Sequence, residues 1–274
     1  MRVTIATDRA PGQLENEDFA GSVAHAAVLL DGAGLSGVDD GGCAHGVAWY
    51  TRKLGTCLLA NLHNDADSEL THALSSAIAE VAASHQATCD LAHPGTPSAT
   101  VVILRERSEH LDYLVLADST LVLAGLHGDF TVVTDQREAE IGRRYRAEMD
   151  ALIGGTAAHA KARAEYVAKL RAHRNREGGF FVAAADPDVA KHSLTATAKR
   201  SEARHALLLS DGASRLNDRF RQQSWAQTLQ LVTSDGPGSL IAAVREAEHE
   251  DPEGHRWPRG KIHDDATAIL CELS

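Results

Sequence analysis

The sequence predicts an α+β fold in which antiparallel sheets pack together and helices cover their outer faces. Apolar runs follow one another at short intervals between residues 99 and 134, and such spacing is typical of hairpins. Helical segments arrive in pairs between the apolar runs, whereas a parallel fold would alternate single helices with single strands. No internal repeat or low-complexity linker interrupts the chain. We therefore expect one domain spanning residues 1–274.

The first half of the chain is expected to hold six strands and two helices. The strands are short apolar runs at 3–7, 22–30, 99–104, 111–117, 120–124 and 130–134. Apolar residues that recur on one face predict a helix over 44–62, and a second helix is expected over 68–92. Glycines mark a loop over 32–42, and the sequence His-Pro-Gly-Thr-Pro breaks the chain at 93–97.

The second half begins with a segment dense in Ala, Arg, Glu and Lys, which predicts helix over 136–176. Strands are expected at 180–185, 206–209 and 266–273, and helices at 217–232 and 239–249. Basic residues cluster at 143–146 and 161–176, but interleaved acidic residues indicate a solvated helix face.

Composition excludes several classes of function. Hydrophobic residues make up 43% of the 274 residues and aromatic ones only 4%, so the core is expected to consist mainly of Ala, Val, Leu and Ile. The net charge of −11 argues against non-specific binding to nucleic acid or to an anionic membrane. The start lacks the apolar stretch of a signal peptide, and no run reaches the length of a membrane span. We expect a cytoplasmic protein.

The cysteines and histidines show no metal-binding pattern in the sequence. None of the four cysteines forms a CxxC pair, and their spacing matches no zinc motif; they are Cys43, Cys57, Cys89 and Cys271. We expect them to be reduced and structural. The fifteen histidines likewise give no recognisable ligand set. His45 follows the glycine-rich loop, and a helix cap is a better expectation for it than a proton donor.

Four short acidic stretches are the most informative feature of the chain. They are residues 16–18 (Asn-Glu-Asp), 31–34 (Asp-Gly-Ala-Gly), 210–212 (Ser-Asp-Gly) and 264–267 (Asp-Asp-Ala-Thr). At least three of them directly precede or follow an expected strand, so their carboxylates are held at the rim of a core. Converging carboxylates repel one another unless a cation lies between them. Their hard oxygen atoms favour magnesium or manganese over zinc.

In this order, the motifs resemble those of the metal-dependent protein phosphatases of type 2C, in particular the bacterial members. Besides the four acidic stretches, residues 117–120 (Ala-Asp-Ser-Thr) match the family's Gly-Asp-Ser-Arg turn, and residues 96–100 match its Gly-Ser-Thr-Ala strand entry. The resemblance extends from residue 16 to residue 273. It implies a four-layer α-β-β-α sandwich of two antiparallel sheets flanked by helices, with metals at one end of the sheets.

The resemblance also implies a site and an activity. Asp18, Asp31, Asp211 and Asp264 would bind two Mg²⁺ or Mn²⁺ ions, and the carbonyl of Gly32 would be a further ligand. Glu17 would act through water, and Asp118 matches one ligand of a third ion found in bacterial members. A hydroxide that bridges the two ions would attack phosphoserine or phosphothreonine of a protein substrate.

Three departures from the family pattern concern the substrate side of the site. Gln13 stands where the family usually has an arginine that clamps phosphate, so Arg9 is the candidate for that role. Ala33 stands where eukaryotic members often have a histidine general acid. Asp265 replaces the asparagine of the usual Asp-Asn pair, and no arginine follows residues 118–119. The basic segment 143–176 matches the position of the family's variable flap, which suggests a role in substrate selection.

These departures leave two alternatives open. One is a regulatory or binding module that keeps the fold with weak or no catalysis. The other is a small-molecule phosphomonoesterase on the same scaffold.

Overall fold

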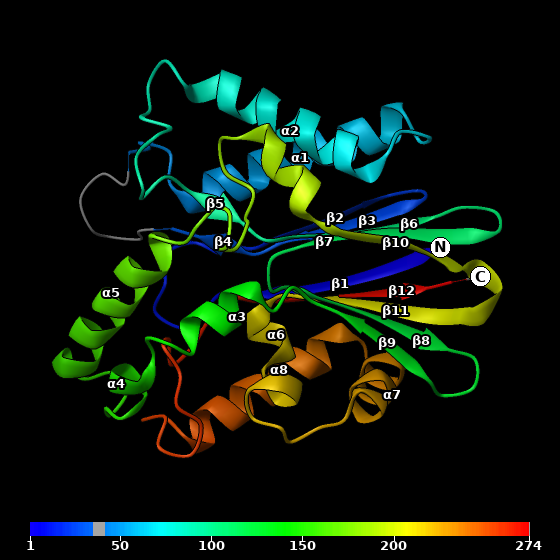
Figure 1. Cartoon of the computed structure of the whole chain (residues 1–274). Coiled ribbons are helices and arrows are strands. Elements are labelled where there is room, and N and C mark those ends of the chain that lie inside the picture. Colours follow the sequence, from blue (N-terminus) through cyan, green and yellow to red (C-terminus); the bar gives the residue numbers. More distant parts are fainter. Residues whose placement is uncertain (35–41, 274) are drawn as a thin grey trace.

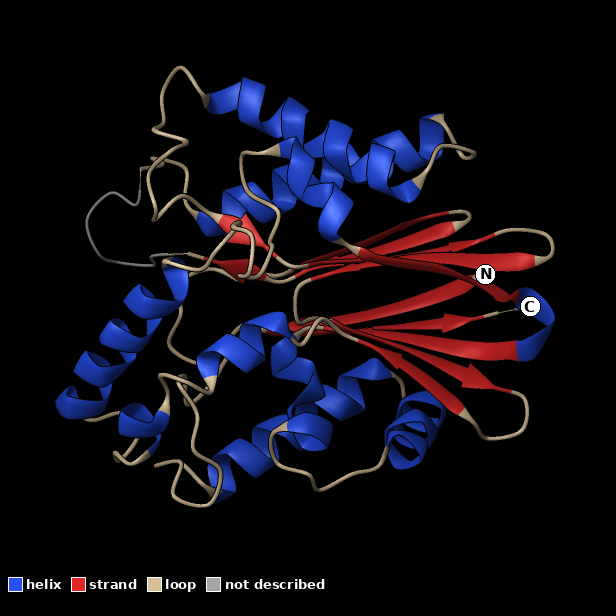
Figure 2. Ribbon diagram, in the orientation of Figure 1, coloured by secondary structure: helices blue, strands red, loops and turns tan. Residues whose placement is uncertain are grey.

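The computed structural model describes residues 1–34 and 42–273. Two five-stranded antiparallel sheets lie face to face, and helices cover both outer faces (Figure 1; Figure 2). The expected four-layer α+β architecture is confirmed. Most of the glycine-rich loop expected over 32–42 lies outside the described residues.

The first sheet has the strand order β10-β7-β6-β3-β2. These strands are β10 (Leu194–Lys199), β7 (His110–Leu116), β6 (Val101–Glu106), β3 (Ala26–Leu30) and β2 (Phe19–Val23). Its outer face is covered by α1 (Val47–Asn64) and α2 (Leu70–His85), as Figure 1 shows. The 3₁₀ helix η1 (Pro187–His192) packs against α2 and leads into β10.

The second sheet has the strand order β1-β12-β11-β8-β9. These strands are β1 (Arg2–Asp8), β12 (Ala266–Glu272), β11 (Ala203–Leu209), β8 (Thr120–Gly125) and β9 (Phe130–Val133). Its outer face is covered by α6 (Asp211–Asp218), α7 (Trp225–Asp235) and α8 (Pro237–Glu250) (Figure 1). A short 3₁₀ helix, η2 (Arg200–Glu202), joins β10 to β11.

A further group of elements lies at the end of the sheets opposite the two termini (Figure 1). It consists of the two-stranded sheet of β4 (Gly32–Ala33) and β5 (Ser98–Ala99) and of the helices α3 (Arg137–Gly142), α4 (Ala147–Asp150) and α5 (Ala157–Arg171). The segment 136–176 is therefore three helices, where the sequence predicted one continuous helical segment.

The central strands read as unbroken apolar runs because both of their faces are buried. In β3, Ala26, Val28 and Leu30 pack in the cluster beneath α1 and α2, while Ala27 and Leu29 pack between the two sheets. Successive side chains of a strand point to opposite faces, so each face of β3 needs apolar residues. The resulting rigid core fixes the positions at which the strands end.

Three expectations about individual elements are wrong, and one strand was not expected. The single strand expected over 22–30 is the hairpin of β2 and β3. Residues 180–185 form only isolated bridges at Phe180 and Ala183. The helix expected over 217–232 is interrupted between α6 and α7, where Ser224 forms a capping box with Gln227. The edge strand β10 was missed, since its exposed Leu-Thr-Ala-Thr-Ala-Lys sequence contains no apolar run.

Among the described residues, no helix is both long enough and apolar enough to span a membrane.

Candidate active site

The ends of strands from both sheets meet at one edge. In the second sheet, Asp8 pairs with Ala266, and Leu209 pairs with both Ala268 and Thr120. In the first, Leu30 pairs with Phe19, and Val101 pairs with Leu116. This register places five acidic residues at the same end of the two sheets, which we call the acidic edge. They are Asp18 before β2, Asp31 after β3, Asp118 between β7 and β8, Asp211 after β11 and Asp264 before β12. The convergence expected from the sequence is therefore present.

Asp31 is held by two of the other motifs. Its backbone N–H donates to Thr100 Oγ1 (3.2 Å), and its carbonyl accepts from the N–H of Thr100 (2.9 Å). The Thr100 hydroxyl also bonds to Ser119 Oγ at 2.6 Å. The backbone N–H of Asp211 donates to Oδ2 of Asp31 (3.2 Å). The polar residues at 100 and 119 thus orient Asp31.

Asp18 is positioned by the asparagine of its own motif. Asn16 Oδ1 accepts from the backbone N–H of Asp18 (2.9 Å), and Asn16 Nδ2 donates to Thr7 Oγ1 (2.8 Å). The Thr7 hydroxyl bonds to that of Thr267 (2.7 Å), whose side chain also hydrogen-bonds to Asp18. These contacts join the start of the chain to the start of β12.

The two neighbouring aspartates before β12 have different roles. Asp265 is buried, and its carboxylate accepts from the backbone N–H groups of Ala10 and Glu17, each at 2.7 Å. It therefore fixes the loop that carries Asp18. Asp264 instead pairs with Lys261 Nζ (2.6 Å) and with Arg215 Nη2 (3.4 Å).

Two glycines of the motifs allow close backbone approach. A Cβ on Gly32 would lie 2.4 Å from the carbonyl oxygen of Glu17, and one on Gly212 would lie 1.9 Å from the carbonyl oxygen of Asp265. Real Cβ contacts do not reach such distances. The absence of a side chain at these positions brings Asp18 beside Asp31, and α6 beside the segment before β12.

The carboxylates raise one another's pKa. Burial, with the charges of Asp265, Asp264 and Asp211, raises the pKa of Asp18 to about 8, although the hydrogen bond from Thr267 lowers it. Burial and the charge of Asp211 raise the pKa of Asp118 to about 7. The pKa values of Asp31 and Asp211 are raised by burial and by neighbouring carboxylates as well. The cluster is therefore short of positive charge.

One carboxylate oxygen at this edge is buried without a partner. Within the described residues, Asp18 Oδ2 has no hydrogen-bond donor. A buried acceptor without a donor is costly, and a cation is the usual remedy for a carboxylate. Hard carboxylate oxygens are the ligands that Mg²⁺ and Mn²⁺ prefer, so the residues present fit divalent cations of this class.

The site also contains charged residues that the sequence did not indicate. Glu138 of α3 is half-buried, and desolvation and the charges of Asp118 and Asp211 raise its pKa well above its ordinary value. Lys261 is a cation held within the cluster by Asp264. The position of Lys261, three residues before Asp264, could have indicated that it lies in the site. Glu138 lies in a charged helical segment whose sequence gives no such indication.

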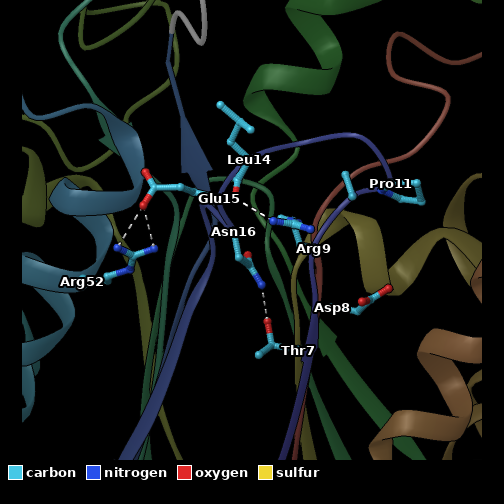
Figure 3. Close-up of a pocket in the computed structure, with 9 residues that line it drawn as sticks. Thr7, Asp8, Arg9, Pro11, Leu14, Glu15, Asn16 and Arg52 are labelled. Carbon is cyan, nitrogen blue, oxygen red and sulfur yellow. Dashed lines mark hydrogen bonds and ion pairs between the residues drawn. The ribbon is translucent and has the colours of Figure 1, made fainter.

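Arg9 lies in an open pocket at the loop between β1 and β2 (Figure 3). It is exposed, and its Nη1 donates to the carbonyl oxygen of Leu14 (2.6 Å). The pocket is lined by Thr7, Asp8, Arg9, Ala10, Pro11, Leu14, Glu15, Asn16 and Arg52. No hydrogen bond or ion pair recorded among the described residues joins Arg9 to the five aspartates. The structure thus places Arg9 near the acidic edge without bringing it into the cluster.

Ala117 stands where the family's turn has glycine. Its φ is +67°, the left-handed region that favours glycine, and the family's turn has glycine at this position. The turn geometry is therefore kept in this chain with an alanine, and Asp118 follows it.

The basic segment 161–176 is only partly a solvated helix face. Arg174, beyond the end of α5, donates to the carbonyl oxygens of Pro94 (2.8 Å) and Thr96 (3.2 Å) and to Ser98 Oγ (3.2 Å). The expectation of a wholly solvated segment is wrong for this arginine, which ties the segment after α5 to the chain before β5.

Comparisons with known proteins agree with this architecture. Residues 12–245 match the family model of protein phosphatase 2C. No curated protein sequence matches the chain significantly.

Solved structures with the same fold include bacterial phosphatases. The serine/threonine phosphatase Stp1 from Staphylococcus aureus is 13% identical with a TM-score of 0.62, covering 99% of this chain and 94% of its own. The phosphatase MsPP from Mycobacterium smegmatis, solved with cacodylate, is 16% identical with a TM-score of 0.58, covering 100% and 99%. The catalytic domain of the phosphatase PstP, solved with two manganese ions, is 17% identical with a TM-score of 0.55, covering 99% and 97%.

The family match covers most of the chain, and the sheets, helices and motif order agree with it. At the level of the family, the expectation of a metal-dependent protein phosphatase is confirmed. The chain belongs to the protein phosphatase 2C family.

Proposed function

We propose that this protein is a Mg²⁺- or Mn²⁺-dependent serine/threonine protein phosphatase. Asp18, Asp31, Asp211 and Asp264 would hold two cations, with the carbonyl oxygen of Gly32 as a further ligand. The observation that carries the proposal is the convergence of these carboxylates at one strand edge, with Asp18 Oδ2 buried and without a partner among the described residues. The two manganese ions of the structurally similar PstP support it.

The bound cations would supply an activated water and neutralise the negative charge of the phosphate. The protein's own residues hold the ligands in place. Asn16 and Asp265 fix the loop that carries Asp18, while Lys261 and Arg215 pair with Asp264. We further propose that Asp118 is a ligand of a third ion and that Glu17 acts through water.

Arg9 is the proposed phosphate-binding residue. A guanidinium carries five N–H donors, of which the bond to Leu14 uses one. Arg52 lies in the same pocket but pairs with Glu15 at 3.4 Å. Arg9→Ala should therefore raise KM for a phosphopeptide more than Arg52→Ala does, with little change in kcat. Equal KM values for the two variants would remove Arg9 from the site.

The proposed substrate is a phosphorylated protein, and the proposed compartment is the cytoplasm. All four cysteines are free in the structure, which agrees with a reducing environment. Segment 143–176 lies at the same end of the sheets as the acidic edge (Figure 1), where it could contact the polypeptide around a phosphorylated residue.

The release of phosphate from phosphoserine and phosphothreonine peptides of the same sequence tests the proposal. We expect turnover of phosphoserine and phosphothreonine peptides with Mn²⁺ or Mg²⁺, and none with a chelator. Calorimetric titration should show that about two to three cations bind, two at the four aspartates and a third at Asp118. Cation binding without turnover would indicate a regulatory module. Turnover of small phosphomonoesters alone would indicate a phosphomonoesterase.

A further inference from the structure

A second set of metal-ligand residues lies away from the five aspartates. Cys43 and His45 directly precede α1, His85 is the last residue of α2, and Cys89 lies in the turn that follows. Their ligand atoms all lie within 4.8 Å of one another. Within the described residues this is the one group of at least three Cys, His, Asp or Glu with that spacing. The spacing along the sequence did not reveal this set, because its members come from the chain before α1 and from the end of α2.

Four distances between ligand atoms of this cluster lie between 3.4 and 3.6 Å. Cys43 Sγ lies 3.6 Å from His45 Nδ1, 3.6 Å from His85 Nδ1 and 3.4 Å from Cys89 Sγ. Cys89 Sγ lies 3.4 Å from His45 Nδ1. In a tetrahedral zinc site with ordinary Zn–S and Zn–N bonds, two sulfurs are about 3.8 Å apart and a sulfur and a nitrogen about 3.6 Å apart. Four of the six distances between ligand atoms are thus within about 0.4 Å of those in a tetrahedral zinc site, and the other two do not exceed 4.8 Å.

The backbone holds together the chain segments that carry the two sulfurs. Cys43 is buried and Cys89 is half-buried, and the backbone N–H of Cys89 donates to the carbonyl oxygen of His85 at 3.0 Å. The backbone also joins the two halves, since Asp90 N–H donates to the carbonyl of Gly42 at 2.7 Å.

The two imidazoles are fixed by packing. The ring of His45 stacks on Trp49 with centroids 4.2 Å apart, and Trp49 lies 5.1 Å from His85. His85 is buried, and its ring centroid lies 5.8 Å from that of His45. His45 makes no side-chain helix cap; Gly46 is the N-cap of α1. The expected capping role of His45 is therefore wrong.

We propose that Cys43, His45, His85 and Cys89 bind one structural Zn²⁺ ion. Two sulfurs and two ring nitrogens complete a tetrahedral zinc site and leave no open position for a substrate, which is typical of structural rather than catalytic zinc. Soft sulfur and imidazole ligands favour Zn²⁺, whereas the five aspartates favour Mg²⁺ or Mn²⁺. The two sites therefore select different metals, and this inference does not depend on the proposed function.

The ion would fasten the chain before α1 to the chain after α2. On binding, the two thiols lose their protons to solvent and the imidazoles bind as neutral rings, so the charges balance without any oxidant or reductant. α1 and α2 pack on each other and cover the first sheet. Loss of the ion should therefore loosen this helical layer first.

A disulfide between Cys43 and Cys89 is the competing state. Their sulfurs are 3.4 Å apart, whereas a disulfide bond is about 2.05 Å long. A disulfide would leave both histidines without a role, so the geometry favours a metal. The two states differ in the mass of the chain and in its free thiols.

Metal analysis of the purified protein tests the proposal directly. The protein is prepared without chelator, passed through a desalting column and analysed by plasma mass spectrometry. We expect about one Zn²⁺ per chain, and the same content in the Asp31→Asn/Asp211→Asn double variant. Cys43→Ser and Cys89→Ser should each lower the zinc content at least about tenfold.

Matched control variants separate the loss of a ligand from general damage. Cys57→Ala removes a buried sulfur from α1, and His72→Ala removes an exposed imidazole from α2. Both should keep their zinc. Because His45 is exposed, His45→Ala should fold even if a cysteine variant does not, and it should lose zinc.

Cobalt substitution gives an independent readout. With Co²⁺ in place of Zn²⁺, the wild-type protein should show the visible bands of a tetrahedral ion and a near-ultraviolet thiolate-to-cobalt band. Cys89→Ser should lose both, because it no longer holds the ion. A wild-type protein with free thiols and no zinc, a Cys43–Cys89 disulfide detected by mass, or equal zinc in His45→Ala and His72→Ala would each overturn the proposal.

Discussion

The backbone N–H of Asp211 donates a hydrogen bond to Oδ2 of Asp31 over 3.2 Å, although 180 residues separate the two in the chain. Asp31 follows β3 of one sheet, and Asp211 follows β11 of the other. The bond therefore crosses from one sheet to the other at the acidic edge. It shows that the carboxylates meet because two rigid sheets end at the same place.

Removing one carboxylate at this edge should separate activity from stability. In Asp31→Asn and Asp211→Asn the side chains keep their size but lose a charged ligand, and we expect activity to fall at least about 100-fold. Metal-free stability should not fall, because a like charge leaves a cluster whose members raise one another's pKa. Turnover assays and urea unfolding in chelator measure the two effects.

The control for this prediction is Asp188→Asn, an exposed aspartate of η1 that pairs with Lys191. It should change neither activity nor stability measurably. Full activity in Asp31→Asn would show that the acidic edge is not the catalytic centre.

Gly212→Ala should destabilise the protein and lower its activity together. The new Cβ would lie 1.9 Å from the carbonyl oxygen of Asp265, so backbone must shift, and we expect a cost of about 2 kcal/mol or more. The shift would displace Asp211 and Asp264. Urea unfolding and kcat measure the outcome.

Gly238→Ala is the matched control for Gly212→Ala. Gly238 lies in the first turn of α8, and a Cβ there would meet only Ala6, at 4.0 Å. This variant should be as stable as wild type or more stable, by up to about 1 kcal/mol. A similar loss in both variants would mean that alanine at a helix start, rather than the clash, is responsible.

Graded substitution at Asp265 should reveal its role as an acceptor for two backbone N–H groups. Asp265→Asn keeps one acceptor oxygen, and we expect a loss of about 1 kcal/mol; Asp265→Ala keeps none, and we expect about 3 kcal/mol. Activity should fall in the same order, because the loop that carries Asp18 loses its anchors. Equal unfolding free energies for the two variants would contradict this role.

Asp112 should stabilise the far side of the first sheet in a pH-dependent way. Its carboxylate accepts from Arg105 Nη2 (2.9 Å), Arg107 Nε (2.7 Å) and Thr197 Oγ1 (3.1 Å), and His110 lies 3.6 Å away. Asp112→Asn leaves Arg105, which is 2% exposed, without its main counter-charge. We expect a loss of about 2 to 4 kcal/mol at neutral pH.

The loss of this stabilisation at low pH follows from the pKa of Asp112. Partial burial raises this pKa, but the hydrogen bonds from Arg107 and Arg105 outweigh it, so the folded-state pKa lies below its ordinary value. The stabilisation is therefore complete above the unfolded-state pKa and is lost as pH falls through the folded-state pKa. Wild type and Asp112→Asn should converge in urea unfolding free energy between about pH 5 and pH 2. Parallel pH curves would contradict this account.

The sequence alone was sufficient to locate most strands and the residues at their ends. Apolar runs such as the one before Asp31 are local patterns, and the burial of both faces of β3 explains why that run is unbroken. Each acidic motif is also local, so their order along the chain could be compared with a family. The interruptions of the helical segments and the exposed strand β10 could not be predicted from the sequence. Capping contacts and edge pairing depend on neighbours that the local sequence pattern does not contain.

Sequence by itself therefore determined the α+β class, the family and the acidic residues that converge at one edge. Only the tertiary structure decided the role of Asp265, the presence of Glu138 and Lys261 in the cluster, and the meeting of Cys43 with His85. Hydrophobic periodicity and motifs act over a few neighbouring residues. The partners of Asp265 and Cys43 lie 248 to 255 and 42 to 46 residues away, and the packing of the sheets and helices brings them together.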